Sequence, residues 1–237
     1  MNRSQSQKGR RQKGFLILAI LAGLLAGLAG CGAYQHAPYL TDPKIQAGPP
    51  EAFVRPSYTD YRSYRLAILP FRVPAQVVDV GFPITEVFHR QILEKKPFQT
   101  VVRVNEYANN LAQAQHLAKE QGADLFILGE VPYFLDSGCT AISGVQVDLK
   151  IVETSSGRII WYLSDNIKAE PAPIYDLWVT ETKPKDSPSI YYLVETLATR
   201  MTTAMQTNLE AMAQQQANAV TPCADITGST CRPTGKK

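Results

Sequence analysis

The sequence predicts an α/β (α+β) protein with a single β-α-β-α-β-β-β-α domain, in which helices pack on a mixed sheet. Continuous apolar runs at residues 65–71 and 123–131 are typical of strands buried on both faces. Residues 145–151 instead alternate apolar and polar side chains, which indicates a strand with one wet face. The chain of 237 residues is 45% apolar and 19% charged, a composition that suits a packed core and excludes wholesale disorder, collagen and coiled coil.

The first elements follow from periodicity and breakers. The run at 65–71 is closed by Pro70-Phe71, and the apolar residues of 84–92 are spaced for one helical face that ends before Pro97. β-branched residues then predict a strand at 98–104. A weaker helix at 111–118 is followed by Gly122, in the position of a C-terminal cap.

The remaining elements change in pattern. Residues 123–131 are predicted as a central strand, and the turn at 154–157 joins the alternating strand to a partner at 158–163. Ser187-Pro188 indicates a cap and a first-turn proline. An apolar stripe over 190–212 then predicts a long final helix.

The first thirty residues resemble a targeting segment. Five cations precede the uncharged apolar run Phe15–Gly30, as in the n-region and h-region of a signal peptide. Sixteen residues span roughly 24 Å as a helix, which is short of the ~30 Å hydrocarbon core. Without this segment the chain carries 19 basic and 21 acidic side chains, so a partnership with nucleic acid is excluded.

Leu28-Ala29-Gly30-Cys31 resembles the lipobox of bacterial lipoproteins at all four positions. The resemblance implies cleavage before Cys31, which would then carry several acyl chains and anchor the protein to a membrane. The next residue is Gly32 rather than the aspartate of inner-membrane retention, which implies the outer membrane, facing the periplasm.

Composition divides the whole chain into four parts. Residues 1–30 are predicted as the lipoprotein signal peptide, and the proline-rich residues 31–57 as a tether. The globular domain is expected over 58–212, and residues 213–237 are expected to be a disordered tail.

The other cysteines are interpreted through export to an oxidising compartment. A local disulfide is predicted between Cys223 and Cys231, where it would close a nine-residue loop in the tail. Cys139 is then a small, half-buried residue, and a bridge from it to the tail stays an alternative.

Three segments together resemble the curli-secretion-lipoprotein/TolB-N-terminal-like superfamily of envelope domains, namely residues 66–71, 122–131 and 149–161. The resemblance covers about 100 to 150 residues in element order. That group includes the lipoprotein activators of penicillin-binding proteins and the small lipoprotein of the Pel polysaccharide exporter. The resemblance implies the fold of this superfamily but does not indicate which of its members the chain is most similar to.

The sequence offers no convincing catalytic or metal site, and no cofactor is expected. Asp136-Ser137-Gly138 is similar to the segment around a trypsin-like serine nucleophile, which needs a histidine as its base. The histidines after the targeting segment are His36 in the predicted tether and His89 and His116 on predicted helices, so the segment is interpreted as a loop turn. Asp124 and Glu130 flank the central strand and are interpreted as solvent-facing charges rather than as an acid–base pair. His89 and His116 lack the spacing of metal ligands.

The segment 174–179 stands out because it is apolar and aromatic, yet prolines bound it. Tyr175, Leu177 and Trp178 are therefore predicted as partner-binding residues, with burial against the sheet as the alternative. The expected function is that of a non-enzymatic assembly, export or regulatory lipoprotein acting through an envelope protein partner or self-association. The alternatives are an envelope hydrolase using Ser137 or a carboxylate pair, and a glycan- or small-ligand-binding lipoprotein stacking its ligand on Trp161 and Trp178.

Overall fold

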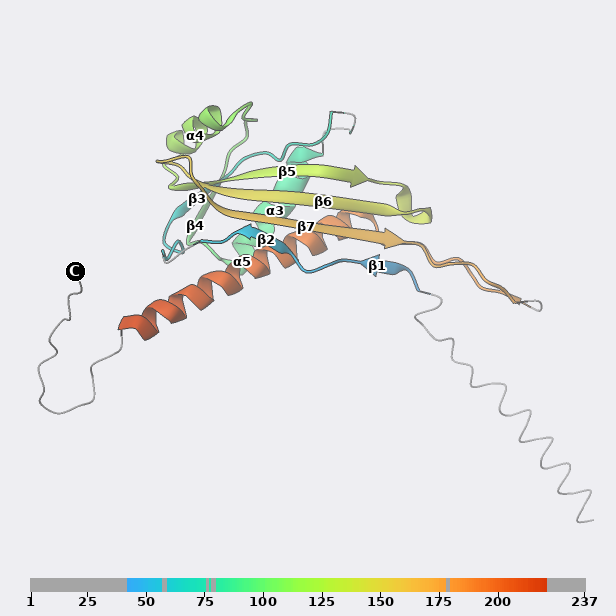
Figure 1. Ribbon diagram of the computed structural model, residues 1–237. Coiled ribbons are helices and arrows are strands. Elements are labelled where there is room, and N and C mark those ends of the chain that lie inside the picture. Colours follow the sequence, from blue (N-terminus) through green and yellow to red (C-terminus); the bar gives the residue numbers. More distant parts are fainter. Residues whose placement is uncertain (1–41, 57–58, 76, 78–79, 178–179, 221–237) are drawn as a thin grey trace, which may run out of the picture. The chain divides into compact units, whose positions relative to one another are not determined.

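The structure is a computed structural model that describes residues 42–56, 59–75, 77, 80–177 and 180–220. Within them the chain forms two compact units, residues 43–171 with 186–220, and residues 172–185 with Asp42. The larger unit confirms the predicted α/β fold, because three helices pack on a mixed seven-stranded sheet of order β1-β7-β6-β5-β3-β4 (Figure 1). β2 also pairs with β7. The bounds of its elements are β1 Lys44–Gln46, β2 Glu51–Val54, β3 Arg65–Ile68, α3 Gly81–Lys95, β4 Thr100–Arg103, α4 Leu111–Glu120, β5 Leu125–Leu135, η2 Gly138–Thr140, β6 Ser143–Glu153, β7 Ile159–Glu170 and α5 Ile190–Val220.

The sheet has a parallel half and an antiparallel half. In the parallel half, β3 lies between β4 and the first residues of β5 and runs parallel to both. In the antiparallel half, β5, β6 and β7 form long ladders, and β1 and β2 pair antiparallel with the outer side of β7. β5 belongs to both halves, which confirms the prediction that residues 123–131 form a central strand.

The helices cover the two faces unequally. α3 and α5 pack on one face, over a large core that runs the length of the sheet. α4 packs on the other face, where Phe126 of β5 and Leu69 contact its buried side, and it covers only the parallel half (Figure 1). The rest of that face carries the half-exposed polar side chains of β6 and β7, as the alternating pattern predicts.

The helix ends follow ordinary capping rules. α3 ends before Pro97 with Lys96 in the left-handed conformation at φ 52°, and its N–H donates to the Ile92 carbonyl. Asn110 caps α4 by accepting from the Gln113 N–H at 2.8 Å, and Gly122 follows that helix at φ +63°, as predicted. The cap of α5 is Ser189 rather than the predicted Ser187, because the Ser189 hydroxyl accepts from the Tyr192 N–H at 3.4 Å.

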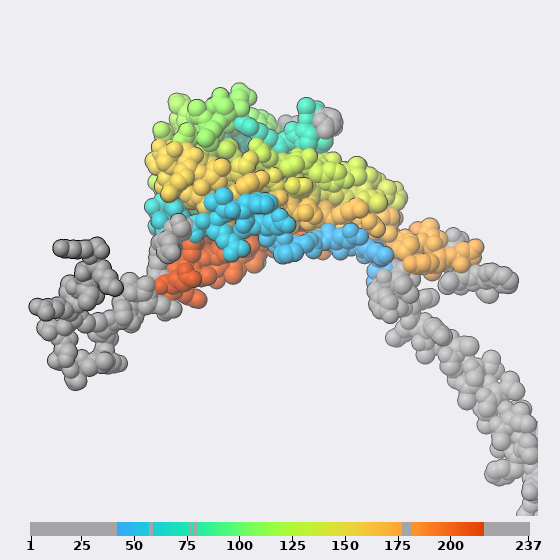
Figure 2. Space-filling model, in the orientation of Figure 1, coloured from blue at the N-terminus to red at the C-terminus, as the bar shows by residue number. Residues whose placement is uncertain are grey.

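Two predicted boundaries need correction. β1 and β2 lie inside the predicted tether, where they add exposed edge strands to β7 without an apolar period of their own. Figure 2 shows them in blue as a surface strip alongside the sheet. At the other end α5 continues to Val220, so residues 213–220 of the predicted tail are helical. Among the described residues no helix is long and apolar enough to cross a membrane.

Candidate functional site

The smaller unit contains a β-hairpin around the residues predicted to bind a partner. β8 (Asp176–Leu177) pairs antiparallel with β9 (Thr180–Glu181) in a sheet of its own. The hairpin is closed by the Ala172 N–H on the Lys185 carbonyl at 3.0 Å and the Thr182 N–H on the Tyr175 carbonyl at 3.0 Å. The backbone N–H of Tyr175 also donates to the Thr182 hydroxyl at 2.8 Å.

This hairpin exposes apolar side chains. Ile174 is 53% and Tyr175 is 40% exposed, and Leu177 lies in β8. Trp178, the third predicted contact, lies outside the described residues. A two-stranded hairpin is at best marginally stable in water by itself, so exposed apolar residues on it favour a contact with another surface.

The predicted covalent sites lie outside the described residues. These sites are Cys31 for the lipid, and Cys223 and Cys231 for a disulfide. Cys139, which the structure does describe, has a free thiol and sits in η2. Its carbonyl accepts from the Ser187 N–H at 2.8 Å, so the backbone of Cys139 fixes the chain that leads into α5.

Trp161 cannot stack on a ligand as the glycan alternative requires. It is 1% exposed and belongs to the core under α5, because every second residue of β7 faces inward. The adjacent Tyr162 faces the open side instead. There its hydroxyl donates to Asp148 at 3.3 Å, and its ring packs against Phe53 at a centroid distance of 5.1 Å.

The charges on this open face are paired with one another. Asp148 also accepts from the Ser164 hydroxyl at 2.6 Å, and Lys150 Nζ lies 3.1 Å from a Glu130 carboxylate oxygen. Lys150 further lies 5.3 Å above the Tyr162 ring. The face is therefore a closed polar network rather than a row of unsatisfied groups waiting for a ligand.

The residues of the hydrolase alternative do not converge. The Asp124 carboxylate accepts from the Arg65 N–H at 2.9 Å before β5 begins, and Glu130 lies six residues further along, about 20 Å away in an extended strand. In the described part of the chain no hydrogen bond joins the Ser137 hydroxyl to a histidine, and His116 instead lies 3.5 Å from Glu120. No group of three or more metal-ligating side chains occurs among the described residues.

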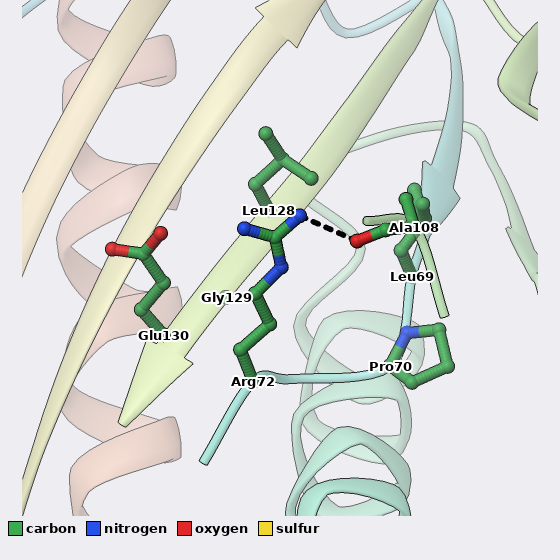
Figure 3. A pocket seen from close by; sticks show the side chains of 7 residues that line it. All are labelled: Leu69, Pro70, Arg72, Ala108, Leu128, Gly129 and Glu130. Carbon is green, nitrogen blue, oxygen red and sulfur yellow. Dashed lines mark hydrogen bonds between the residues drawn. The ribbon is translucent and has the colours of Figure 1, made fainter. Parts of the chain in front are cut away.

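A crevice at the end of the parallel half is a candidate site that the sequence analysis missed. The connection after β3 leads to α3 on one face, and the connection after β4 leads to α4 on the other. Such a divergence at the carboxyl ends of neighbouring parallel strands leaves a space between the two connections, and α/β proteins commonly bind ligands there. An inner pocket of about 20 Å³ occupies this place (Figure 3) and is lined by Leu69, Pro70, Arg72, Ala108, Leu128, Gly129 and Glu130.

Arg72 lines both the inner pocket and the wider hollow of this crevice. Its backbone is fixed to β5 on both sides, since its N–H donates to the Gly129 carbonyl at 2.9 Å and its carbonyl accepts from Val131 at 2.8 Å. Its guanidinium donates to the Ala108 carbonyl, as Figure 3 shows. A wider, open hollow of about 470 Å³ adjoins the same arginine and is lined by Val73, Tyr107, Ala108 and Asn109.

One buried ion pair was also missed. Asp165 of β7 is inward-facing, and its carboxylate lies 3.1 Å from Arg200 of α5. Arg200 also donates to the Gly48 carbonyl between β1 and β2, so it fixes the edge strands to the core. Burial raises the pKa of Asp165 to about 6, against the lowering effects of Arg200 and of the Asn166 N–H. Neither Arg72 nor this pair has a sequence signal, because a lone arginine acquires its partners only through the fold.

Comparisons with known proteins find similarity in structure alone. No protein-family model and no curated protein matches the chain. Similar solved structures include the PelC dodecamer from Paraburkholderia phytofirmans, at 13% identity and TM-score 0.46 over 69% of this chain and 97% of that chain. Lipoprotein GNA1162 from Neisseria meningitidis is 12% identical at TM-score 0.38, over 65% of this chain and 99% of that one. The LpoB C-terminal domain from Salmonella enterica is 16% identical at TM-score 0.33, over 44% of this chain and 82% of that one.

These three structures are distant likenesses of the chain, at 12 to 16% identity. At TM-scores below 0.5 they establish neither a shared family nor a function for this chain.

Proposed function

We propose that this protein is a lipid-anchored lipoprotein of the bacterial envelope that acts through protein contacts, as an assembly, export or regulatory factor rather than as an enzyme. The observation that carries the proposal is the hairpin at residues 172–185, which keeps Ile174 and Tyr175 exposed in a sheet of only two strands. In this proposal Tyr175, Leu177 and Trp178 contact the partner, which is another envelope protein or a second copy of the chain.

The anchor in this proposal is the acylated Cys31, on the periplasmic side of the outer membrane. Because β1 begins at Lys44, 12 residues separate the cysteine from the sheet. That length reaches about 45 Å when fully extended, roughly half the reach of the whole predicted tether. The lipid would therefore keep the sheet within about 45 Å of the membrane surface, where a short hairpin can meet a membrane-associated partner.

The role of Trp178 decides which free energy its replacement changes, the affinity for the partner or the stability of the fold. A well-buried aromatic residue at an interface is worth about 2 kcal/mol or more, which is roughly thirty-fold in affinity. If Trp178 is instead part of the core, its replacement by alanine costs about 3–5 kcal/mol of folding stability. The two roles differ in what they disturb, and one variant separates them.

The decisive experiment places a photo-crosslinking amino acid at Tyr175 and, as a matched control, at His116. His116 is highly exposed on α4, away from the hairpin in the sequence. We expect a discrete crosslinked product from intact envelopes at position 175 and none at position 116. Equal crosslinking at both positions, or none at either, would contradict the proposed contact surface.

A companion experiment compares Trp178→Ala with the unaltered protein by thermal melting and sizing. We expect an unchanged melting temperature with loss of the crosslinked product or of the oligomer. Unfolding of the variant, with normal association of the folded remainder, would assign Trp178 to the core. A large homo-oligomer on sizing would favour an export assembly, and a monomer that co-purifies with one protein would favour a regulatory role.

The anchor is tested separately with Cys31→Ala. We expect this variant to accumulate as an unprocessed precursor that takes up no radiolabelled palmitate. Normal processing and labelling would show that Cys31 is not the lipid site.

A further inference from the structure

We propose that the crevice around Arg72 binds a carboxylate, presented by a small ligand such as the C-terminus of a short peptide. This inference is independent of the hairpin and its partner. It rests on the position of the crevice in the sheet, on the charge of Arg72, which pairs with no described carboxylate, and on the chemistry of the residues that line the crevice.

Among the described residues, the charge of Arg72 has no carboxylate partner. The other charged residue of the inner pocket, Glu130, lies within 3.1 Å of Lys150, and Figure 3 shows the Glu130 side chain directed away from the bond between Arg72 and Ala108. No ion pair to Arg72 occurs among the described residues. A guanidinium has five N–H donors, and in the described structure its hydrogen bond goes to the neutral Ala108 carbonyl.

The arginine is also held in place before any ligand arrives. Both backbone bonds to β5 and the side-chain bond to Ala108 restrict its rotamers. A fixed guanidinium loses less conformational entropy on binding than a free surface arginine does. Its planar fork then presents further N–H groups in the geometry that matches the two oxygens of a carboxylate.

The surroundings select the kind of anion. Arg72 is the sole charged residue among the described residues that line the wider hollow, and one positive charge balances one carboxylate. A phosphomonoester carries a charge of about −1.5 to −2 and is less well matched by a single cation. The walls beside the arginine are contributed by Val73, Ala108 and Tyr107, which suit the small apolar body of a peptide end.

The place of the site in the fold agrees with this chemistry. The crevice lies where the connections after β3 and β4 leave toward opposite faces, and its walls come from these two connections and from β5. The hollow of about 470 Å³ is large enough for a dipeptide-sized group, and the inner pocket has room for about one water-sized atom group.

The test uses the full mature chain and two matched peptides, acetyl-Ala-Ala with a free carboxylate and the same peptide with a C-terminal amide. Binding raises the melting temperature in a dose-dependent way, and unfolding is followed by the fluorescence of the buried Trp161. We expect the acid to bind at least ten-fold more tightly than the amide. Equal responses to the two peptides, or no response to either, would overturn the proposal.

Two substitutions that each remove one arginine charge test whether the preference for the acid peptide depends on Arg72. Arg72→Gln should abolish the preference for the acid. Arg103→Gln, which removes an exposed arginine of the edge strand β4 that pairs with Glu86, should leave the preference intact. A preserved preference in Arg72→Gln would overturn the assignment. Should that variant fail to fold, Arg72→Lys keeps the charge without the planar fork, and we expect it to prefer the acid less strongly than the unaltered protein does.

Inorganic phosphate is the third probe. We expect it to raise the melting temperature less than acetate does at equal concentration and ionic strength. A larger, Arg72-dependent effect of phosphate would assign the crevice to phosphate chemistry and overturn the carboxylate proposal.

Discussion

The parallel half of the sheet is buried on both faces, whereas the antiparallel half is buried on one face. In the parallel half, neighbouring residues of β5 point to opposite faces and both are buried, Phe126 under α4 and Ile127 under α3 and α5. In the antiparallel half, Trp161 is buried while Tyr162 next to it faces the open side. The number of covered faces therefore decides whether a strand reads as a continuous apolar run or as an alternating one.

The comparison also explains where the candidate ligand site lies. Helices on both faces of the parallel half force the two connections apart and leave a crevice, and Arg72 lies in it with no ion pair to any described residue. On the open face of the antiparallel half, charges such as Lys150 and Glu130 neutralise each other. A polar face thus need not be a site, whereas a single unpaired arginine in a crevice is a better candidate.

The largest expected effects come from alanine substitutions at neighbouring positions in each half. Phe126→Ala and Ile127→Ala should both destabilise the protein, by about 3–5 and 2–5 kcal/mol, because both side chains are fully buried. Trp161→Ala should cost about 3–5 kcal/mol, but Tyr162→Ala only about 1 kcal/mol or less. Urea unfolding measures all four. A small cost at either Phe126 or Ile127 would show that one face of the parallel half is not covered.

A smaller contrast is expected from glycines in the two halves. A Cβ at Gly129 would lie 2.3 Å from the ring of Phe71, which is buried against Phe88 and cannot withdraw. Gly129→Ala should therefore cost about 1–3 kcal/mol. At Gly144 the nearest atom is 3.1 Å away, on the exposed Tyr133 ring, so Gly144→Ala should cost less than about 1 kcal/mol. Thermal melts of the two variants should differ, and equal melting temperatures would contradict the packing at Gly129.

The buried carboxylate of the antiparallel half should make stability depend on pH. The pKa of Asp165 is raised from 3.8 to about 6 in the folded protein, chiefly by desolvation, so the folded state holds this proton more tightly than the unfolded state. The protonated Asp165 therefore stabilises the folded state. Its contribution to the free energy of unfolding, roughly 1–2 kcal/mol, is fully present below about pH 4 and is lost as pH rises through about 6. Asp165→Asn should flatten this part of the profile in urea unfolding between pH 4 and 7. An unchanged slope in the variant would show that Asp165 does not cause it.

The smallest effect is expected on the open face. Lys150→Ala removes a partly exposed ion pair with Glu130 and should cost about 0.2–1 kcal/mol, less at high salt. Measuring unfolding at low and high salt separates this term from lost packing on Tyr162. A cost above 2 kcal/mol that salt does not reduce would mean that this face is covered after all.

The predictable elements are those whose reason for forming is local. The helix 190–212 and the alternating strand 145–151 were correct because a helix or strand that buries one face repeats its apolar residues at a fixed spacing. β1 and β2 were missed because they bury almost nothing, and their order comes from backbone pairing with β7 more than a hundred residues away. Their exposed side chains and the prolines that flank them are typical of a tether.

The candidate sites divide in the same way. The lipobox at Cys31 and the apolar segment around Trp178 are contiguous in the chain, so the sequence alone could propose them. It could not choose which aromatic of Trp161-Tyr162 faces solvent, because that choice depends on which side of the sheet α5 covers. Nor could it find Arg72.

The sequence by itself therefore determined the order and type of the main elements and the division between a continuous and an alternating half-sheet, and it predicted the targeting segment. These properties follow from side-chain periodicity over fewer than about twenty residues. Only the tertiary structure decided that Arg72 lies between Ala108 and Glu130 and that Asp165 meets Arg200, since each contact joins elements 35 to 58 residues apart. Burial and unpaired charge are properties of such contacts, and for that reason the crevice becomes visible only in the folded chain.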